Sequence, residues 1–307
     1  MSMKKQIGIF WGPESLSLAE TQRDQLIFAA TIPRQIPTSS EPSTGLQNVT
    51  APENIHLTAA VQRLIRELKI NKPNVHLAIP MRDIIFRTFS LPVMNPQEIE
   101  NAVMFEAPRY IPFKLNELFY TYHAVAFTEK DVKKNQILFL AIRRDTFDQY
   151  IKTLEDAELE VSFAEPSVLA LLRILAIKKL AKSNQTIALV QASDTQGVVM
   201  IANHQIPQFI RDFNLFKTIA SSPSEPELKS LTERILNEVR ISLEFYARQN
   251  KAAHPENRIE QIYVFASQNA SEIAQGLRTD LGIKATFLDI NDIFPYENSL
   301  PPDMANA

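Results

Sequence analysis

The stretch IGIFWGPESLSLAE, residues 7–20, decides which fold is expected for this chain. An apolar run at residues 7–10 reaches a turn at Gly12, and a second, alternating run leaves it, so the stretch predicts a β-hairpin. Folds that hold a nucleotide phosphate on such a hairpin place an acid near the end of the first strand and small residues in the turn. Here these positions hold Phe10, Trp11, Gly12 and Pro13. The sequence therefore predicts the hairpin but lacks the acid.

The pattern of the opening segment returns in the second half of the chain. The opening segment is expected to form three short strands, a β-meander, which is followed by an amphipathic helix and a strand. A second meander is followed in the same way by a long helix, a strand, a helix and a strand. These elements fall at residues 5–10, 15–19, 25–30, 60–68 and 75–79, and then at residues 187–190, 198–201, 208–213, 226–249, 261–266, 273–281 and 284–288. The duplication predicts an α/β protein with a two-lobed actin-like (RNase H-like) fold.

A separate block interrupts the first copy at about residues 80–160. It contains a strand, a helix with Asn95 as N-cap and Glu98 at the capping-box position, two strands around a charged loop, and a helix capped by Asp145. We expect a β-α-β-β-α insertion in a first lobe of residues 1–180. Residues 181–294 then form a reduced second lobe, and the Pro-rich residues 295–307 form a flexible tail. The polar residues 36–53 are expected to form a long loop.

Composition and motifs exclude several classes of function. The net charge of −3 gives no general attraction to nucleic acid or acidic lipid, and no cysteine is present. The five histidines lack ligand spacing, and no hydrolase motif can be read, so no metal site and no catalytic residue are expected. The apolar run VLALLRILAI, residues 168–177, is too short to span a membrane and carries Arg173 in its middle.

Glycine is unusually scarce for a nucleotide-binding protein. The chain has six glycines in 307 residues, and no two lie within three residues of each other. Phosphate-binding loops need glycine because backbone N–H groups must approach the anion closely, often at positive φ. The chain therefore has neither a Walker loop nor a GxGxxG motif.

Three stretches resemble a known family. They are LPVMNPQEIENAVMFEAPRYIPFKLNELFYTYHAV at residues 91–125, LEDAELEVSFAEPSVLALLR at residues 154–173 and RILNEVRISLEFYARQ at residues 234–249. Together they resemble the PilM family of type IV pilus assembly proteins. The resemblance implies an actin-like fold in the cytoplasm, docked on the cytoplasmic tail of a single-span inner-membrane protein such as PilN. The cytoplasmic domain of GspL-type secretion proteins is similar in fold, but it continues into a membrane helix that this chain lacks, which favours the PilM family.

This chain departs from the family pattern at the elements that hold the nucleotide in the family. The first phosphate hairpin of the family reads Ile-Asp-Ile-Gly and the second Val-Asp-Ile-Gly, whereas this chain has residues 9–12 (IFWG) and 190–193 (VQAS). The Gly-Gly of the family's third element is replaced at residues 266–269 (ASQN). The family's subdomain before the long helix is reduced to NLFKTIASSPSEPELKS. All four nucleotide-holding parts are altered or missing, which predicts a lost site.

Two groups of residues are candidate sites. Gly12, Ser193, Asp194 and Thr195 mark the vestigial nucleotide positions, where Asp194 and Thr195 either coordinate magnesium and phosphate or form an ordinary polar turn. Trp11 either plugs the vestigial site or packs in the core. The second candidate is an aromatic groove for a partner peptide. The alternative is that its residues pack the small core of the insertion. They are Arg109, Tyr110, Phe113, Tyr120 and Tyr122.

The sequence thus predicts a non-catalytic scaffold of a pilus or secretion machine, peripheral to the inner membrane through a PilN-like partner. No cofactor, metal or nucleic acid is expected, and self-association is left open. The alternative is a nucleotide-dependent assembly protein of the same family that binds ATP and Mg through backbone groups around Gly12 and Ser193. A third possibility, a small-molecule kinase, requires a catalytic Asp beside a phosphate cradle, and no such Asp can be placed.

Overall fold

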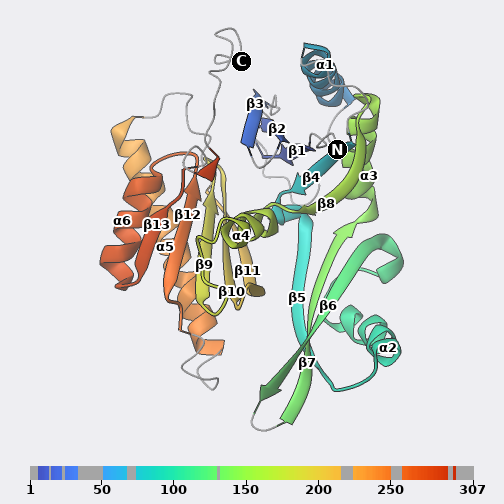
Figure 1. Ribbon diagram of the computed structural model, residues 1–307, viewed down its shortest axis with the longest axis vertical. Coiled ribbons are helices and arrows are strands. Elements are labelled where there is room, and N and C mark those ends of the chain that lie inside the picture. Colours follow the sequence, from blue (N-terminus) through green and yellow to red (C-terminus); the bar gives the residue numbers. More distant parts are fainter. Residues whose placement is uncertain are drawn as a thin grey trace. The chain divides into compact units, whose positions relative to one another are not determined.

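The computed structural model forms two compact units, each described by itself (Figure 1). The structure describes residues 6–13, 15–22, 25–33, 51–67, 74–129, 132–215, 224–249, 258–289 and 293–294. Unit 1 comprises residues 1–80, 145–167 and 294–307, and unit 2 comprises residues 81–144 and 168–293. This grouping places residues 81–144 with the second large sheet, whereas the lobe boundaries expected from the sequence stay a prediction. The expected tail lies outside the described residues.

Unit 1 is built on a five-stranded sheet. Its strands are β1 (Gln6–Trp11), β2 (Ser15–Gln22), β3 (Gln25–Pro33), β4 (Asn74–Ile79) and β8 (Glu160–Pro166), and their order across the sheet is β3-β2-β1-β4-β8. The first three strands are antiparallel, as the hairpin pattern predicts, and β4 and β8 are parallel to β1. The parallel pairs need crossover helices, which are α1 (Ala51–Glu67) and α3 (Arg144–Asp156).

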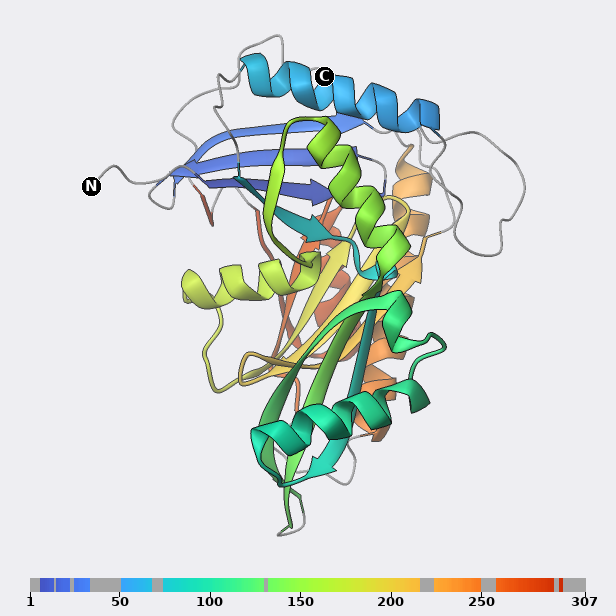
Figure 2. The same ribbon diagram turned by 90° about the vertical axis from the view of Figure 1, so that its right-hand side faces the viewer.

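The helices cover one face of this sheet because the strands alternate. Ile7, Ile9 and Trp11 are buried on β1, and the residues between them are not. Trp11 is 3% exposed and packs edge-on against Tyr150 of α3, with ring centroids 4.9 Å apart. Figure 2 shows α1 and α3 along the same face. The structure therefore gives Trp11 the packing role of the two weighed from the sequence.

Unit 2 contains a second five-stranded sheet with two layers of helix. Its strands are β9 (Thr186–Ala192), β10 (Gln196–Asn203), β11 (Ile206–Asn214), β12 (Gln261–Ala266) and β13 (Lys284–Phe287), in the order β11-β10-β9-β12-β13. The long helix α5 (Glu225–Gln249) and α6 (Ala270–Leu281) pack on one face. The opposite face packs against α4 (Ser167–Ile177).

The two large sheets have the same topology, so the duplication expected from the sequence is confirmed. Each copy runs strand, strand, strand, helix, strand, helix, strand; the fourth strand of each copy lies beside the first, and the fifth lies beside the fourth. The end of the insertion therefore moves. The helix that begins near Asp145, which the sequence analysis placed in the insertion, is α3, the crossover between β4 and β8. The structure also adds β8, an edge strand that the sequence analysis missed because its polar residues hide the alternation.

The insertion is a three-stranded antiparallel sheet with one helix. It consists of β5 (Ile84–Pro92), β6 (Leu118–Glu129), β7 (Val132–Arg143), α2 (Pro96–Glu106) and the short 3-10 helices η1 (Met81–Asp83), η2 (Ala107–Arg109) and η3 (Leu115–Glu117), with strand order β5-β7-β6. The predicted capping box is confirmed, since Glu98 N–H donates to the Asn95 side chain and Asn95 N–H donates to that of Glu98. The helix α2 packs on one face of the sheet around Phe139 and Val103.

The boundary between the expected loop and the first helix also moves. The helix α1 begins at Ala51, so residues 51–53 belong to it, and residues 34–50 lie outside the described part of the chain. Between β11 and α5 the chain has only residues 215–224, which agrees with the short connection noted in the sequence.

One glycine of unit 2 supports an aromatic ring. Gly197 on β10 is the cross-strand neighbour of Phe213 on β11, and a Cβ at this glycine would lie 2.2 Å from the ring. The Phe213 ring is 6% exposed, so it has little room to move away. Gly8 on β1 differs, because a Cβ there would have no atom within 4 Å.

We predict that Gly197→Ala destabilises the protein by about 1–3 kcal/mol, as overpacking of a core does. Gly8→Ala is the matched control and is expected to leave the free energy of unfolding unchanged or slightly higher. Urea unfolding measures both, and Phe213→Leu in the Gly197→Ala background should recover part of the loss. Equal stability of the two alanine variants would contradict the prediction.

Candidate functional site

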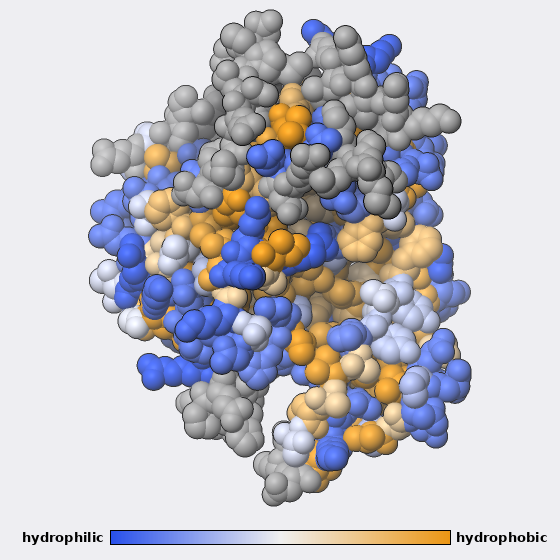
Figure 3. All heavy atoms as spheres, viewed as in Figure 1, coloured by the Kyte–Doolittle hydropathy of each residue, from blue (hydrophilic) through white to orange (hydrophobic). Residues whose placement is uncertain are grey.

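A groove of about 380 Å³ lies within unit 2, between the three-stranded sheet, α4 and the turn between β10 and β11. Most of its wall is apolar. The sheet contributes the face opposite α2, and Figure 3 shows hydrophobic side chains over this sheet. The residues that line the groove are Phe86, Thr121, Tyr122, His123, Leu138, Leu140, Leu169, Leu172, Arg173, Ala176, Gln205 and Pro207. A cavity of this size and composition suits a small apolar group or a short peptide segment.

The side of α4 that faces the groove follows from helical spacing. Leu169, Leu172, Arg173 and Ala176 stand at positions i, i+3, i+4 and i+7, which lie on one stripe of a helix. The other side of α4 is buried in the apolar cluster that covers the second large sheet, with Val168 and Leu175 fully buried, and Leu172 of the groove stripe also reaches this cluster. The helix therefore packs on its sheet with one side and presents a mainly apolar stripe to the groove.

The walls of the groove are fixed to one another. Phe86 of β5 packs against the same apolar cluster as Leu172 of α4. The Gln136 side chain on β7 donates to that of Gln208 on β11 at 3.0 Å. The chain just beyond α4 is also held, because the Tyr263 hydroxyl donates to the Leu180 carbonyl at 2.6 Å. Burial raises the pKa of Tyr263 above its ordinary value, so the hydroxyl keeps its proton at neutral pH.

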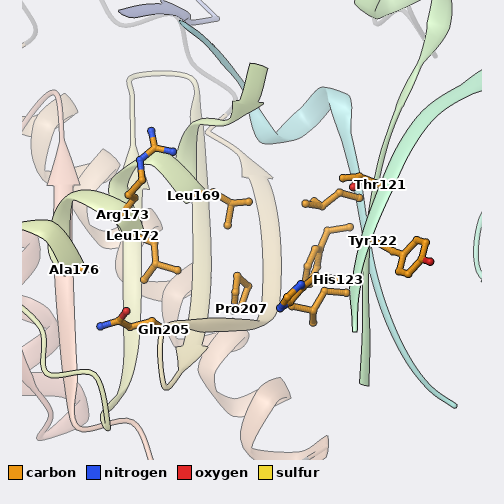
Figure 4. A pocket seen from close by; sticks show the side chains of 12 residues that line it. Thr121, Tyr122, His123, Leu169, Leu172, Arg173, Ala176, Gln205 and Pro207 are labelled. Atoms are coloured by element: carbon orange, nitrogen blue, oxygen red, sulfur yellow. The ribbon is translucent and has the colours of Figure 1, made fainter. Parts of the chain in front are cut away.

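Polar side chains stand at the two ends of the groove. Figure 4 shows Arg173 and Thr121 toward one end and Gln205 and His123 toward the other, with Leu169 and Leu172 along the wall between them. Tyr122 contributes to the lining but points its ring away from the groove. A ligand with an apolar middle and polar ends would match this arrangement.

The aromatic residues singled out in the sequence lie on the other face of the three-stranded sheet. Tyr110 stacks on Phe89 with ring centroids 5.0 Å apart, and Tyr120 stacks on Phe139 at 5.5 Å. Tyr110 is 45% exposed and Tyr120 38% exposed. The structure therefore brings these tyrosines to the α2 side, where each covers a buried ring, and their role toward a partner stays a prediction.

The remaining members of this group also have partners within the insertion. Arg109 forms an ion pair with Glu106 at 2.8 Å, and its guanidinium lies 4.9 Å from the centre of the Phe105 ring. Phe113 packs with Tyr122 against the α2 cluster. Phe113 also lines an open hollow of about 620 Å³ formed by residues of the segment 108–117.

The groove was missed in the sequence because its residues come from distant segments. One signal was present: residues 136–142, QILFLAI, form a nearly continuous apolar run, which is typical of a strand buried on both faces. In the structure Phe139 packs toward α2, and Leu138 and Leu140 line the groove on the other face.

The tip of the β9–β10 hairpin closes on its own hydrogen bonds. The Ser193 hydroxyl lies 3.2 Å from the Gln196 amide nitrogen and 3.4 Å from that of Thr195, and it accepts from both. The Ser193 N–H donates to the Gln196 carbonyl at 2.8 Å, and the Thr195 carbonyl accepts from Leu215. The N–H groups of Ser193, Thr195 and Gln196 are therefore bonded within the turn and are not directed at an anion.

The second and third nucleotide elements of the family meet in unit 2. Asp194 accepts from the Ser267 hydroxyl at 3.0 Å, and the Ser267 N–H donates to the Ala192 carbonyl. Asn269 precedes α6 with φ +50°, and its side chain donates to the Thr232 hydroxyl. The structure thus joins the two elements, with Asp194 hydrogen-bonded to a protein group.

The first hairpin tip, in unit 1, is tight. A Cβ at Gly12 would lie 2.8 Å from the Ser15 carbonyl oxygen, so only glycine fits the turn without a shift. Gly12 belongs to unit 1, whereas Ser193, Asp194 and Thr195 belong to unit 2.

Within the described ranges, no group of three or more His, Asp or Glu side chains could hold a metal ion. In that same part of the chain, no helix combines the length and the apolar character needed to cross a membrane.

We predict that Ser193→Ala weakens the hairpin tip by about 1 kcal/mol, the net value of a typical hydrogen bond. The amide protons of Thr195 and Gln196 should then exchange faster, by roughly fivefold for this change in free energy. Amide hydrogen exchange read by NMR measures the effect, and Ser90→Ala, at an exposed serine of β5, is the control. Unchanged exchange in the Ser193 variant would show that the hydroxyl does not close the turn.

Comparisons with solved structures find chains that are similar to this one. The structure of a PilM-PilN type IV pilus biogenesis complex matches with a TM-score of 0.72 at 18% identity, over 95% of this chain and 90% of that chain. The cytoplasmic domain of EpsL, an inner membrane component of the type II secretion system of Vibrio cholerae, has a TM-score of 0.49 at 8% identity, with 97% and 91% covered. A protein of unknown function with an actin-like ATPase fold from Bacteroides thetaiotaomicron has a TM-score of 0.47 at 11% identity, with 95% and 93% covered. The α/β actin-like fold expected from the sequence is confirmed.

Comparisons of the sequence give the family. None of the curated proteins compared with the chain matches it. The model of the family described as type IV pilus assembly protein PilM matches residues 39–216, which is more than half of the chain. The protein therefore belongs to the PilM family of type IV pilus assembly proteins.

Proposed function

We propose that this protein is a non-catalytic scaffold of pilus assembly, which binds the cytoplasmic tail of a PilN-like membrane protein in the groove of unit 2. Two facts support the choice of partner: the chain belongs to the PilM family, and its fold matches that of a PilM-PilN complex. The protein would then lie in the cytoplasm, at the inner membrane through that partner. The tail would be an extended segment, because the groove is open and runs between a sheet and a helix.

The observation that carries the proposal is the apolar lining of the groove. Leu138, Leu140, Leu169 and Leu172 line it together with Phe86. Each aliphatic side chain that a tail buries there contributes about 1.5–3 kcal/mol before the cost of ordering the tail. A micromolar complex needs about 8 kcal/mol. Two or three buried side chains supply most of this value, and polar contacts at the ends of the groove would supply the rest.

The proposed absence of nucleotide turnover rests on the hairpin tip of unit 2. The Ser193 hydroxyl accepts hydrogen bonds from the N–H groups of Thr195 and Gln196, and the Asp194 carboxylate accepts one from the Ser267 hydroxyl. An incoming phosphate would have to break these bonds and would find no second glycine in the turn. The binding free energy of a phosphate at this tip would therefore be reduced by the free energy of the hydrogen bonds that it breaks.

A nucleotide-dependent assembly protein is the second candidate function. One observation favours it: two of the altered nucleotide elements lie together in unit 2, because Asp194 of the second hairpin accepts from Ser267, which precedes α6. The two candidates differ in a single measurable property, the affinity for Mg-ATP.

We predict that Thr121→Arg weakens binding of the tail at least about tenfold, or about 1.4 kcal/mol. Thr121 lines the groove from β6 and its side chain is exposed, so a larger cationic side chain fills the groove with little effect on the core. Fluorescence anisotropy measures the affinity with a labelled peptide that copies the cytoplasmic tail of the PilN-like protein from the same organism.

Thr128→Arg is the matched control, because Thr128 is an exposed residue of the same strand that does not line the groove. It should bind the peptide like the parent protein. Both variants should melt at the parent temperature. Full affinity in a folded Thr121→Arg variant would place the tail elsewhere and refute the proposal.

We predict that Mg-ATP and Mg-ADP give no saturable heat in a calorimetric titration that starts near millimolar ligand. The physical reason is the closed hairpin tip described above. Binding tighter than about 100 μM, or about −5.5 kcal/mol, would instead support the nucleotide-dependent candidate. In that case Ser193→Ala, which releases two N–H groups, should bind more tightly than the parent.

A further inference from the structure

The outer edge of β6 is a row of backbone groups that no described strand pairs. The strand order β5-β7-β6 places β6 at the end of the three-stranded sheet, and its twelve residues pair with β7 on one side only. Along such an edge, alternate residues direct their N–H and C=O groups away from the sheet. These groups form a template for a strand of another chain unless the edge is protected.

The other edge strands of the described sheets carry features that disfavour such pairing. A proline, a basic side chain, a bulge or a very short strand hinders the addition of a further strand. The prolines and basic residues concerned are Pro33 of β3, Arg87 and Pro92 of β5, Pro166 of β8, Pro207 and Arg211 of β11 and Lys284 of β13. In addition, β3, β8 and β11 pair with a shift in register, and β13 has only four residues.

β6 has none of these features. Its sequence LFYTYHAVAFTE contains no Lys, Arg or Pro, and its register with β7 has no shift over the whole length. Exposed residues follow one another along the strand: Phe119, Tyr120, Thr121, His123, Ala126 and Thr128. β6 is therefore a long and regular edge, which is the type that pairs with another strand.

We infer that β6 pairs with β6 of a second copy of this protein, antiparallel and about a two-fold axis, so that two three-stranded sheets join into one. The charge pattern favours a second copy as the partner. Residues 118–128 carry no permanent charge, so two identical strands bring no like charges opposite each other. A two-fold pair uses both edges, so pairing stops at two copies. The inference goes beyond the proposed function, because it does not depend on a docked tail.

The alternation of faces limits the register of this pair. Thr121 and His123 line the groove, whereas Tyr122 and Ala124 pack on the α2 side, and Figure 4 shows the Tyr122 ring pointing away from the groove. Residues directly opposite each other in an antiparallel pair lie on the same face. Even-numbered residues must therefore lie opposite even-numbered ones, so the axis passes through one residue and not between two.

We place Ala124 on the axis. The middle of β6 lies at His123 and Ala124, so an axis at either residue pairs nearly the whole strand. A residue on the axis faces its own copy, and two protonated His123 side chains would repel each other there. The small side chain of Ala124 fits this position. In this register Tyr122 lies opposite Ala126 of the second copy, so a large side chain faces a small one.

The second copy would also extend the wall of the groove. Val125 and Phe127 alternate with Thr121 and His123 along β6, so they lie on the groove side of the sheet. Across the axis, Val125 of the second copy lies opposite His123, and Phe127 of the second copy lies opposite Thr121. Each groove would thus have two apolar side chains of the other copy beside its own residues.

Cysteine cross-linking tests the pairing and its register, because the protein has no cysteine of its own. Ala124→Cys in the full-length chain would place two cysteines opposite each other, with Cα atoms about 4.5–5.5 Å apart, which suits a disulfide. Ala126→Cys is the matched control on the same face of the same strand, and its two copies would lie about 13 Å apart. Diamide is the oxidant, which takes up the two electrons and two protons that the thiols lose.

We expect Ala124→Cys to form a disulfide-linked dimer at least about tenfold faster than Ala126→Cys on a non-reducing gel. A mixture of His123→Cys and Val125→Cys should cross-link faster than either variant alone, since these residues lie opposite each other. Melting temperatures confirm that each variant is folded.

Sedimentation measures the pairing without an added thiol. One strand pair buries less surface than the about 1,200–2,000 Å² of a standard interface, so the dimer should be weak, with a dissociation constant of roughly 10–100 μM. Ala126→Lys, which adds a protective charge to the edge, should stay monomeric where the parent dimerises. Ala126→Ser is the control and should dimerise like the parent.

Three outcomes would overturn the inference. They are equal cross-linking at residues 124 and 126, a parent protein that stays monomeric up to about 500 μM, and a dimer that Ala126→Lys leaves intact. No tail peptide is present in these measurements, so the inference and the proposed function can each fail while the other holds.

Discussion

The packing of α4 is the constraint on which unit 2 depends. A helix made almost wholly of aliphatic residues cannot leave half of its surface in water. One side is buried on the second large sheet, and the groove-facing side lies opposite the three-stranded sheet. The groove is therefore a consequence of sequence composition: the second side of α4 is only partly covered by the fold. A ligand that covers the remaining stripe completes the burial that the helix begins.

The duplication explains where a site for a partner could arise. Both copies have the same strand order, so the core of each copy is fixed by the same crossovers. The difference is the insertion between β4 and α3, which adds a sheet whose two faces are both apolar. One face has its own helix, α2. The other face is not covered by α2, and it forms one wall of the groove.

The parts of the fold that could be read from the sequence are the local ones. The hairpin at Gly12 and the capping box of Asn95 and Glu98 depend on neighbouring residues, and both are confirmed. The edge strand β8 and the role of α3 as a crossover were not read, because they depend on which strands pair across the sheet. The groove is non-local for the same reason. Its residues come from four strands, one turn and one helix, and Arg173 was noticed in the sequence only as a charge in an apolar run.

The hairpin of β6 and β7 is the longest strand pair in the described part of the chain, and it keeps one register throughout. β6 and β7 pair over twelve residues each with no break in register, from Leu118 opposite Arg143 to Glu129 opposite Val132. The pairs β2–β3, β4–β8 and β10–β11 each contain a bulge or irregularity, where a strand bends. A force applied along β6 would act on its whole ladder of hydrogen bonds at once, because no bulge lets the strands part locally. The two strands of this hairpin would therefore have to separate together under such a force, which makes it a stiff element of the fold.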